Sequence, residues 1–259
     1  RDVTAWFGGH VATELRLWDA LEQNLLSPFH YYGVGHERLD FRKANWVGGR
    51  YANSDLDKVL TGDDVIMSWV IQQLRDKVTD PGRMRALAFA STVQHAHFVA
   101  ERLRRAGIST VALDGTTPKE TRRQAMQDLH EGTVQALVTV DLFTEGIDVP
   151  SVDTVLLMRP TESVTVFLQQ LGRGLRRDEG KDVLTVLDFV GFQDRRFRFD
   201  LRFSALTGVT RRDLLRAVED GFPYLPAGSF ITLDRVAQQA VVENVKAHVP
   251  STTRALVDD

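Results

Sequence analysis

Between residues 64 and 191, short apolar runs alternate with longer stretches in which apolar residues recur every three or four positions. Short apolar runs rich in Val, Leu and Ala predict strands that are buried on both faces of a sheet. The predicted strands cover residues 85–90, 108–113, 134–140, 152–158 and 183–189.

The stretches between these runs carry start and stop signals of helices. Residues 65–78 have an amphipathic pattern, and Thr92 is placed to cap a helix that Gly107 ends. Thr117 begins a capping box, and Gly132 ends the helix that follows. Strand and helix therefore alternate, which predicts an α/β fold: a parallel sheet with right-handed crossovers and helices on both faces.

The two ends of the chain do not show this regular alternation of strands and helices. Residues 12–26 predict a helix and residues 29–32 a strand of β-forming residues. The next segment, 34–63, is polar with scattered glycines, and we interpret it as a connection with one helix near residues 54–60. Beyond Gly191 the alternation ends, and further helices are expected near residues 211–219 and 234–248.

Two groups of aromatic residues leave two interpretations open. Trp46 and Tyr51 either stack on a nucleic-acid base or, as we favour, pin a loop to the domain. After Gly191, arginines and phenylalanines are interleaved, which is typical either of a nucleic-acid stripe or of an amphipathic helix that buries its rings. These residues are Arg195, Arg196, Arg198, Arg202, Arg211, Arg212, Phe192, Phe197, Phe199 and Phe203.

Composition narrows the class of protein. Hydrophobic residues make up 43% and charged residues 26% of the 259 residues, as in globular domains. The net charge of −3 argues against a uniformly basic nucleic-acid coat but not against a local basic stripe. No apolar run approaches the roughly 18–20 residues of a membrane span, so we expect a cytoplasmic protein without a membrane partner. Cysteine is absent, which excludes disulfides and Cys-ligated metal.

A cluster of arginines follows the fourth predicted strand. If the segment from Val164 is helical, Gln169, Arg173 and Arg176 lie at i, i+4 and i+7, on one face of the helix. Two guanidinium groups presented together suit an oxyanion cluster such as a triphosphate. The alternative is a solvated helix end. Arg176 and its neighbours would then interact favourably with the negative end of the helix dipole and pair with Asp178.

These residues carry a family resemblance. The string Q-x-x-G-R-x-x-R over residues 169–176 resembles motif VI of superfamily 2 helicases of the DEAD/DEAH type, and residues 144–150 (TEGIDVP) resemble their motif V. Residues 88–92 (AFAST) resemble motif IV, with Asp114-Gly115 at a turn that such proteins share. Residues 186–191 (VLDFVG) are similar to bacterial DNA helicases that carry a phospholipase-D-like nuclease module before the motor.

The resemblance implies a domain organisation. Residues 1–33 would be the tail of a first RecA-like domain, and residues 34–63 the interdomain linker. Residues 64–192 would be the second RecA-like (helicase C-terminal) domain, and residues 193–259 a small helical extension. The fold expected is therefore a RecA-like, P-loop NTPase-like sheet.

The resemblance also implies roles for particular residues. Arg173 and Arg176 would be arginine fingers, supported by Gln169, that reach a nucleotide held by the other RecA-like domain. The remaining residues would bind ATP (Gly146, Asp148, Gly172) or nucleic acid (Ser91, Thr92, Gly115, Thr116, Thr139). Thr92 has a second interpretation as a plain helix cap. Thr139 lies one place before the position at which many relatives have Thr, so alternation along the strand leaves its role open. Because ligands lie past the carboxyl ends of parallel strands, we expect the three motifs to converge at that edge.

Two motifs that bind and hydrolyse ATP are absent from the sequence. It has no G-x-x-x-x-G-K-[ST] loop and no Asp-Glu pair in Walker B context, so the chain alone should neither bind ATP tightly nor hydrolyse it. ATP and Mg²⁺ would be held mainly by the missing first domain. His95 and His97 diverge at i, i+2 on a helix and predict no metal site.

Two functions therefore remain after the sequence is read. The first is the C-terminal motor domain of an ATP-dependent DNA helicase or translocase, with DNA favoured over RNA by the resemblance alone and the first RecA-like domain as partner. The second is a non-catalytic RecA-like module that binds nucleic acid or a protein partner.

Overall fold

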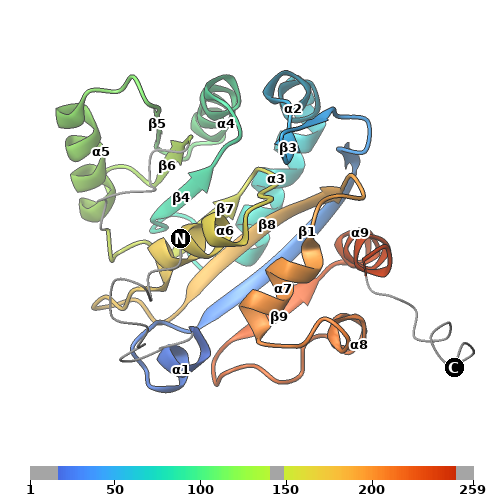
Figure 1. Cartoon of the computed structure of the whole chain (residues 1–259). Coiled ribbons are helices and arrows are strands. Elements are labelled where there is room, and N and C mark those ends of the chain that lie inside the picture. Colours follow the sequence, from blue (N-terminus) through green and yellow to red (C-terminus); the bar gives the residue numbers. More distant parts are fainter. Residues whose placement is uncertain (1–16, 141–148, 249–259) are drawn as a thin grey trace, which may run out of the picture.

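The fold is built on one parallel sheet (Figure 1). The computed structural model describes residues 17–140 and 149–248. Across the sheet the strands follow the order β5 (Thr110–Leu113), β6 (Ala136–Thr139), β4 (Ala86–Phe89), β7 (Thr154–Leu157), β8 (Leu184–Phe192), β1 (Phe29–Asp40) and β9 (Phe230–Leu233). Two short strands of two residues each, β2 (Trp46–Val47) and β3 (Arg50–Tyr51), pair with each other in a hairpin that is separate from this sheet.

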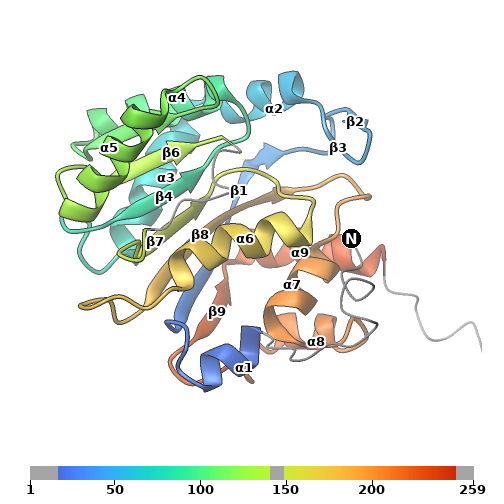
Figure 2. The same cartoon turned by 60° about the vertical axis from the view of Figure 1, so that its left-hand side comes forward.

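Helices cover both faces of the sheet, as the alternation predicted. Helices α3 and α4 lie on one face, and α5, α6 and α7 lie on the other (Figure 2). The helices of the described residues are α1 (Leu17–Glu22), α2 (Asn53–Leu60), α3 (Asp64–Lys77), α4 (Val93–Arg105), α5 (Lys119–Glu131), α6 (Val164–Leu175), α7 (Phe199–Thr207), α8 (Leu214–Glu219) and α9 (Arg235–Lys246).

The apolar runs form the strands because burial on both faces leaves no place for polar side chains. All four residues of β4, β6 and β7 are buried, and so is most of β8. The expected strands within 64–192 are confirmed to within two or three residues at their ends, and the parallel, RecA-like sheet is confirmed with them. The expected helix near residues 54–60 is confirmed as α2.

The domain boundary suggested at residue 33 needs correction. Strand β1 runs through it, and its residues from Phe29 to Gly35 pair with β8 of the same sheet. Scattered glycines from Gly35 onward suggested a connection, but the glycines of β1 allow close packing. A Cβ on Gly33 would collide with Leu233 of β9, and one on Gly35 would lie 2.8 Å from the Val236 carbonyl carbon of α9. Residues 29–40 are therefore a strand of this sheet, not the end of another one.

The extension after residue 192 also differs from the expectation of helices alone. Strand β9 pairs in parallel with β1 over His30 to Gly33 and forms the edge of the sheet. Helix α9 follows it directly, capped by Asp234, whose side chain accepts from the Ala237 amide at 2.8 Å. The last part of the described chain is thus built into the sheet beside β1.

A buried charged group ties the extension to the centre of the sheet. Arg202 of α7 donates from Nη2 to Asp188 Oδ2 of β8 at 2.6 Å, and the Tyr31 hydroxyl of β1 donates to the same oxygen. The Arg202 guanidinium also lies 4.2 Å from the ring centroid of Phe167 in α6. Burial, together with the charge of Asp188, raises the pKa of Tyr31 well above its ordinary value, so its hydroxyl keeps its proton. This group joins two strands and two helices.

Because all seven strands point the same way, the sheet has two chemically distinct edges. We call the edge where the strands end the carboxyl edge, and the edge where they begin the amino edge. A crossover helix between parallel strands must start at the carboxyl edge and end at the amino edge. This rule fixes where each candidate residue lies.

Candidate functional site

The turn after β4 lies at the carboxyl edge and carries Ser91 and Thr92. Thr92 caps α4, because its Oγ1 accepts from the His95 amide at 3.0 Å, and its hydroxyl donates to Asp57 of α2. The cap interpretation of Thr92 is thus confirmed. Ser91 is only 7% exposed, and its Oγ has no hydrogen-bond partner among the described residues. The free amides at the N-terminus of α4 are suited to an anionic ligand. The Ser91 hydroxyl is buried in the conformation described and would have to become exposed to reach such a ligand.

His95 supports this turn from below. Its Nδ1 accepts from the Ser91 amide at 3.3 Å, and the ring is 1% exposed. Burial lowers the pKa of His95 to about 4 from 6.5. Between pH 6.5 and 4 the unfolded chain therefore binds a proton that the folded chain excludes, and stability falls as the pH is lowered through this window.

This pKa leads to a prediction for acid stability. From pH 7 to pH 4, His95 should contribute a loss of roughly 3 kcal/mol in the free energy of unfolding. His95→Asn keeps an acceptor near the Nδ1 position but cannot ionise, so urea denaturation should show a shallower pH dependence for this variant. His97→Asn is the control, since His97 lies on the same helix with a side chain that is 62% exposed. Equal pH slopes for all three proteins would contradict the prediction.

The turn after β5 lies at the same edge. Asp114 Oδ1 accepts from the Thr116 amide at 2.8 Å and from its hydroxyl at 2.6 Å. These hydrogen bonds hold the pKa of Asp114 below its usual value, and the bond from the Thr116 side chain has the largest effect. A Cβ on Gly115 would meet nothing within 4 Å, so the backbone here is open to a ligand. His97 Nε2 of α4 lies 3.5 Å from Asp114 Oδ2 and links this turn to the Ser91 turn.

Thr139 does not join these residues at the surface. It ends β6, its residue exposure is 0%, and its Oγ1 has no hydrogen-bond partner in the described part of the chain. A phosphate cannot reach this hydroxyl in the conformation described. Its burial gives no support to a contact between Thr139 and nucleic acid, because both faces of β6 are covered.

The arginine residues lie at the other edge of the sheet. Helix α6 starts at the carboxyl edge after β7 and ends at Leu175, where Ser27, two residues before β1, donates its amide to the Leu175 carbonyl at 2.8 Å. Arg173 and Arg176 are therefore at the amino edge, opposite the Ser91 turn. The expected convergence of all three motifs at the carboxyl edge is wrong, because a crossover helix ends where the next strand begins.

The shared face of the three side chains also needs correction. Gln169 and Arg173 leave α6 from one face, with Gln169 exposed and Arg173 half-buried. Arg176 is the C-cap residue in an extended conformation, with φ −62° and ψ 141°, so helical spacing no longer applies to it. Its side chain is exposed at the same helix end. The cluster is thus a helix face followed by an extended residue.

Two glycines beside the arginines have different surroundings. A Cβ on Gly174 would collide with Leu184 of β8 and lie 3.1 Å from Val155 Cγ2 of β7, whereas one on Gly172 would meet nothing within 4 Å. Gly174 allows α6 to pack closely on the sheet, while Gly172 leaves an open backbone surface next to Arg173.

Alanine substitutions should separate these two roles. Gly174→Ala should lower the free energy of unfolding by about 1–3 kcal/mol through overpacking. Gly172→Ala should raise it by roughly 0.5–1 kcal/mol, because alanine favours a helix interior. Thermal unfolding of both variants checks this, and a stabilised Gly174→Ala protein would refute the packing argument.

Two residues expected at the nucleotide, Gly146 and Asp148, lie outside the described residues. So does the motif V string up to that point. Val149, which is buried, and Pro150 are the next residues that the structure describes. These two residues precede β7 and therefore lie at the amino edge, the edge that carries Arg173.

The aromatic groups mostly serve packing. Tyr51 is 2% exposed, and its hydroxyl donates to Gln193 Oε1 at 2.9 Å, so it pins the hairpin to the end of β8. Phe197, Phe199 and Phe203 are each 1% exposed. The stripe interpretation is wrong for these rings, which belong to the core. Most of the neighbouring arginines form ion pairs: Arg196 with Asp194, Arg198 and Arg211 with Asp200, and Arg202 with Asp188.

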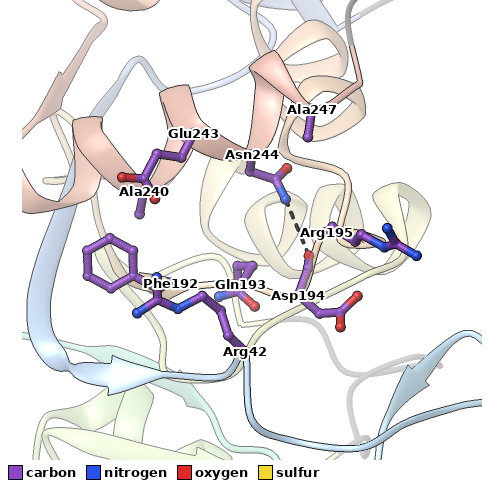
Figure 3. A pocket seen from close by; sticks show the side chains of 9 residues that line it. All are labelled: Arg42, Phe192, Gln193, Asp194, Arg195, Ala240, Glu243, Asn244 and Ala247. Atoms are coloured by element: carbon purple, nitrogen blue, oxygen red, sulfur yellow. Dashed lines mark hydrogen bonds between the residues drawn. The ribbon is translucent and has the colours of Figure 1, made fainter.

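A cavity that the sequence did not indicate adjoins the carboxyl edge at the end of β8 (Figure 3). It has a volume of about 310 Å³ and lies between β8 and α9. Arg42 lies over the ring of Phe192 at 4.7 Å, and Asn244 Nδ2 donates to the Asp194 carbonyl at 3.4 Å. The lining of the cavity includes cationic and anionic side chains, and Arg195 and Glu243 lie on opposite sides of it (Figure 3). Arg42 comes from the glycine-scattered segment, which gave no sign that it would meet β8.

Metal and membrane sites are not found in the described part of the chain. No group of three or more His, Asp or Glu residues in 17–140 and 149–248 could hold a metal ion. No helix among these residues is long and apolar enough to cross a bilayer.

Comparison with known proteins gives the class. Residues 69–178 match the model of the helicase conserved C-terminal domain, and this match spans α4, α6 and both edges described above. This segment is thus similar to the conserved C-terminal domain of helicases.

Individual relatives are similar over parts of their length. A 51.5 kDa protein of a Lactococcus phage is 32% identical over 161 residues, which are 62% of this chain and 34% of the phage protein. A Saccharomyces cerevisiae protein described as ATP-dependent helicase IRC3 is 33% identical over 105 residues, 40% of this chain and 15% of that protein. The chain thus spans about a third or less of these relatives.

The fold is found in a solved structure as well. The ATP-dependent type ISP restriction-modification enzyme LlaBIII, bound to DNA, superposes with a TM-score of 0.59 and 15% identity. The superposition covers 95% of this chain and 18% of that one. Almost the whole chain, including its extension, therefore has a counterpart in a RecA-like fold.

Proposed function

We propose that this chain is the second motor domain of an ATP-dependent superfamily 2 DNA helicase or translocase. The observation that carries the proposal is the separation of two candidate surfaces on opposite edges of one sheet. Arg173 and Arg176 lie at the amino edge, and the turns with Ser91 and Gly115 lie at the carboxyl edge. A motor needs a nucleotide surface and a track surface that move together, and a rigid sheet joins the two.

At the amino edge the chain would complete a nucleotide site held by another domain. Planar guanidinium groups donate bidentately to phosphate oxygens and stay charged, so Arg173 and Arg176 suit the charge that develops during phosphoryl transfer. Gln169 and the open backbone at Gly172 lie on the same helix and would approach the nucleotide with them. ATP and Mg²⁺ would be bound mainly by the first RecA-like domain, with Gly146 and Asp148 contributing from this chain.

At the carboxyl edge the chain would bind the phosphates of a nucleic-acid strand. The N-terminus of α4 and the open backbone at Gly115 offer donors without reading bases. The Ser91 hydroxyl, once exposed, and the Thr116 hydroxyl, on leaving Asp114, would join them. Closing and reopening of two RecA-like domains around ATP would then move this edge along the strand. DNA rather than RNA, a phospholipase-D-like nuclease module elsewhere in the protein and a cytoplasmic location are proposals that rest on the sequence resemblance.

The rival function is a RecA-like module that binds nucleic acid or a protein without an ATP cycle. The carboxyl edge alone would serve such a module, which would not use Arg173 and Arg176 for catalysis. The sequence preceding this chain in the longer protein discriminates between the two, because a Walker A loop there supports the motor.

ATP hydrolysis by the longer protein tests the proposal directly. We expect single-stranded DNA to stimulate hydrolysis and this chain by itself to hydrolyse no ATP. Single-stranded RNA of the same length and sequence is the matched control for the choice of DNA. A longer protein that binds DNA but shows no nucleic-acid-stimulated hydrolysis would favour the rival.

A further inference from the structure

The end of α6 is held by groups from two other segments. A helix leaves its last carbonyls without partners inside the helix. Here the Leu175 carbonyl accepts from the Ser27 amide at 2.8 Å, and the Arg176 carbonyl accepts from the Ser27 hydroxyl at 3.2 Å. Leu26 and Arg176 form an antiparallel bridge beside these bonds. The segment before β1 thus fixes one side of the helix end.

Lys181 fixes the other side. Its Nζ donates to the Gly174 carbonyl, to the Arg176 carbonyl at 2.7 Å and to the Pro150 carbonyl at 3.4 Å. An ammonium group has three donors, and these three carbonyls use all of them. The charge also lies at the negative end of the dipole of α6. Partial burial lowers the pKa of Lys181 to about 8, so the group is not simply a solvated surface lysine.

The three carbonyls belong to segments that the proposed reaction would bring together. Gly174 and Arg176 lie at the end of the arginine-bearing helix, and Pro150 is the last residue of the motif V string. Lys181 itself comes three residues before β8, whose start lies at the amino edge. One side chain therefore ties the arginine end of α6 to the segment that enters β7.

We infer that Lys181 is a positioning residue that holds the backbone of Arg176 extended, so that its guanidinium group is aimed at the nucleotide of the other domain. The inference rests on the proposed function of Arg176. Without the Lys181 donors, the Gly174 and Arg176 carbonyls would lose a partner, and the last residues of α6 could rewind or fray. Arg176 would then keep its charge but lose its direction. A misplacement of about 1 Å can cost roughly a hundredfold in rate.

Steady-state ATP hydrolysis by the longer protein, with saturating nucleic acid, tests this role. Lys181→Met removes the donors and keeps the aliphatic stem, Lys181→Arg restores donors, and Lys246→Met is the control at an exposed lysine of α9. We expect Lys181→Met to lower kcat by roughly 10- to 100-fold with KM for ATP changed less than about threefold. Lys181→Arg should recover part of kcat, and Lys246→Met should match the wild type.

A double variant distinguishes positioning from general stability. If Lys181 acts through Arg176, adding Lys181→Met to Arg176→Ala should lower kcat by less than about threefold further. Because Lys181→Met could loosen the fold, Lys181→Gln, which keeps an amide donor, is measured with it and should give an intermediate kcat.

Each alternative outcome has a distinct meaning. Wild-type kcat for Lys181→Met, or effects that multiply independently in the double variant, would overturn the role of Lys181. Wild-type kcat for Arg176→Ala would instead remove the arginine finger and, with it, the reason for positioning it.

Discussion

Arg176→Ala in the longer protein is expected to lower the turnover of ATP by roughly 10³-fold, the lower end of the range for arginine fingers. Under the proposed function the nucleotide would be held mainly by the other domain, so the affinity for ATP should change by less than about threefold. This separation arises because a finger stabilises charge that exists only in the transition state. Single-turnover hydrolysis and nucleotide binding, measured on the same variant, check both parts.

A neighbouring arginine supplies the control. Arg177 is exposed, and its Nη1 donates to the Asn24 carbonyl at 2.8 Å, so its side chain is directed toward the segment before β1. Arg177→Ala should retain turnover within about twofold, because a surface contact of this kind contributes little. Equal turnover for Arg176→Ala and the wild type would discard the finger assignment.

Arg202→Met is expected to have the largest effect on stability. The substitution keeps much of the side-chain volume but leaves the buried Asp188 carboxylate without its cationic partner and with the hydrogen bond from Tyr31. Removing one partner of a buried ion pair costs about 3–5 kcal/mol, because the other charge can neither reach water nor find a new partner. Urea denaturation of this chain at neutral pH measures the loss.

Two further variants make this prediction specific. Arg196→Met breaks an ion pair with Asp194 in which the Arg196 side chain is 53% exposed, and it should cost less than about 1 kcal/mol. Asp188→Asn combined with Arg202→Met removes both charges and should be less destabilising than Arg202→Met alone. If Arg202→Met lowered the free energy of unfolding no more than Arg196→Met, the buried ion pair of Arg202 and Asp188 would not hold α7 to the sheet.

The sequence predicted the strands of the sheet well because their apolar runs are buried on both faces and tolerate few polar residues. It predicted the start of β1 at residues 29–32 but not its continuation beyond residue 33, where Gly35 was interpreted as part of a loop. Gly33 and Gly35 are instead required by close contacts with β9 and α9. Those contacts come from residues about 200 positions later in the chain, which no local pattern can reveal.

The candidate site was predicted in part. The motif strings identified the Ser91 turn and the arginine helix, but the expectation that all ligands meet at the carboxyl edge ignored the direction in which α6 must run. Helical spacing was extended to Arg176, although Ser27 and Lys181 draw its backbone out of the helix. Ser27 lies 149 positions from Arg176, and Lys181, although only five positions away, belongs to no recognised motif.

The position of β1 between β8 and β9 has a consequence for synthesis of the protein on the ribosome. This strand emerges before both of its neighbours, because its partner Leu184 follows about 150 residues later and Phe230 later still. At translation rates of about 5–20 residues per second, the strand waits on the order of ten seconds with both hydrogen-bonding edges unpaired. During that time it is open to pairing with other nascent chains, and a chaperone that shields residues 29–35 would raise the yield of folded protein.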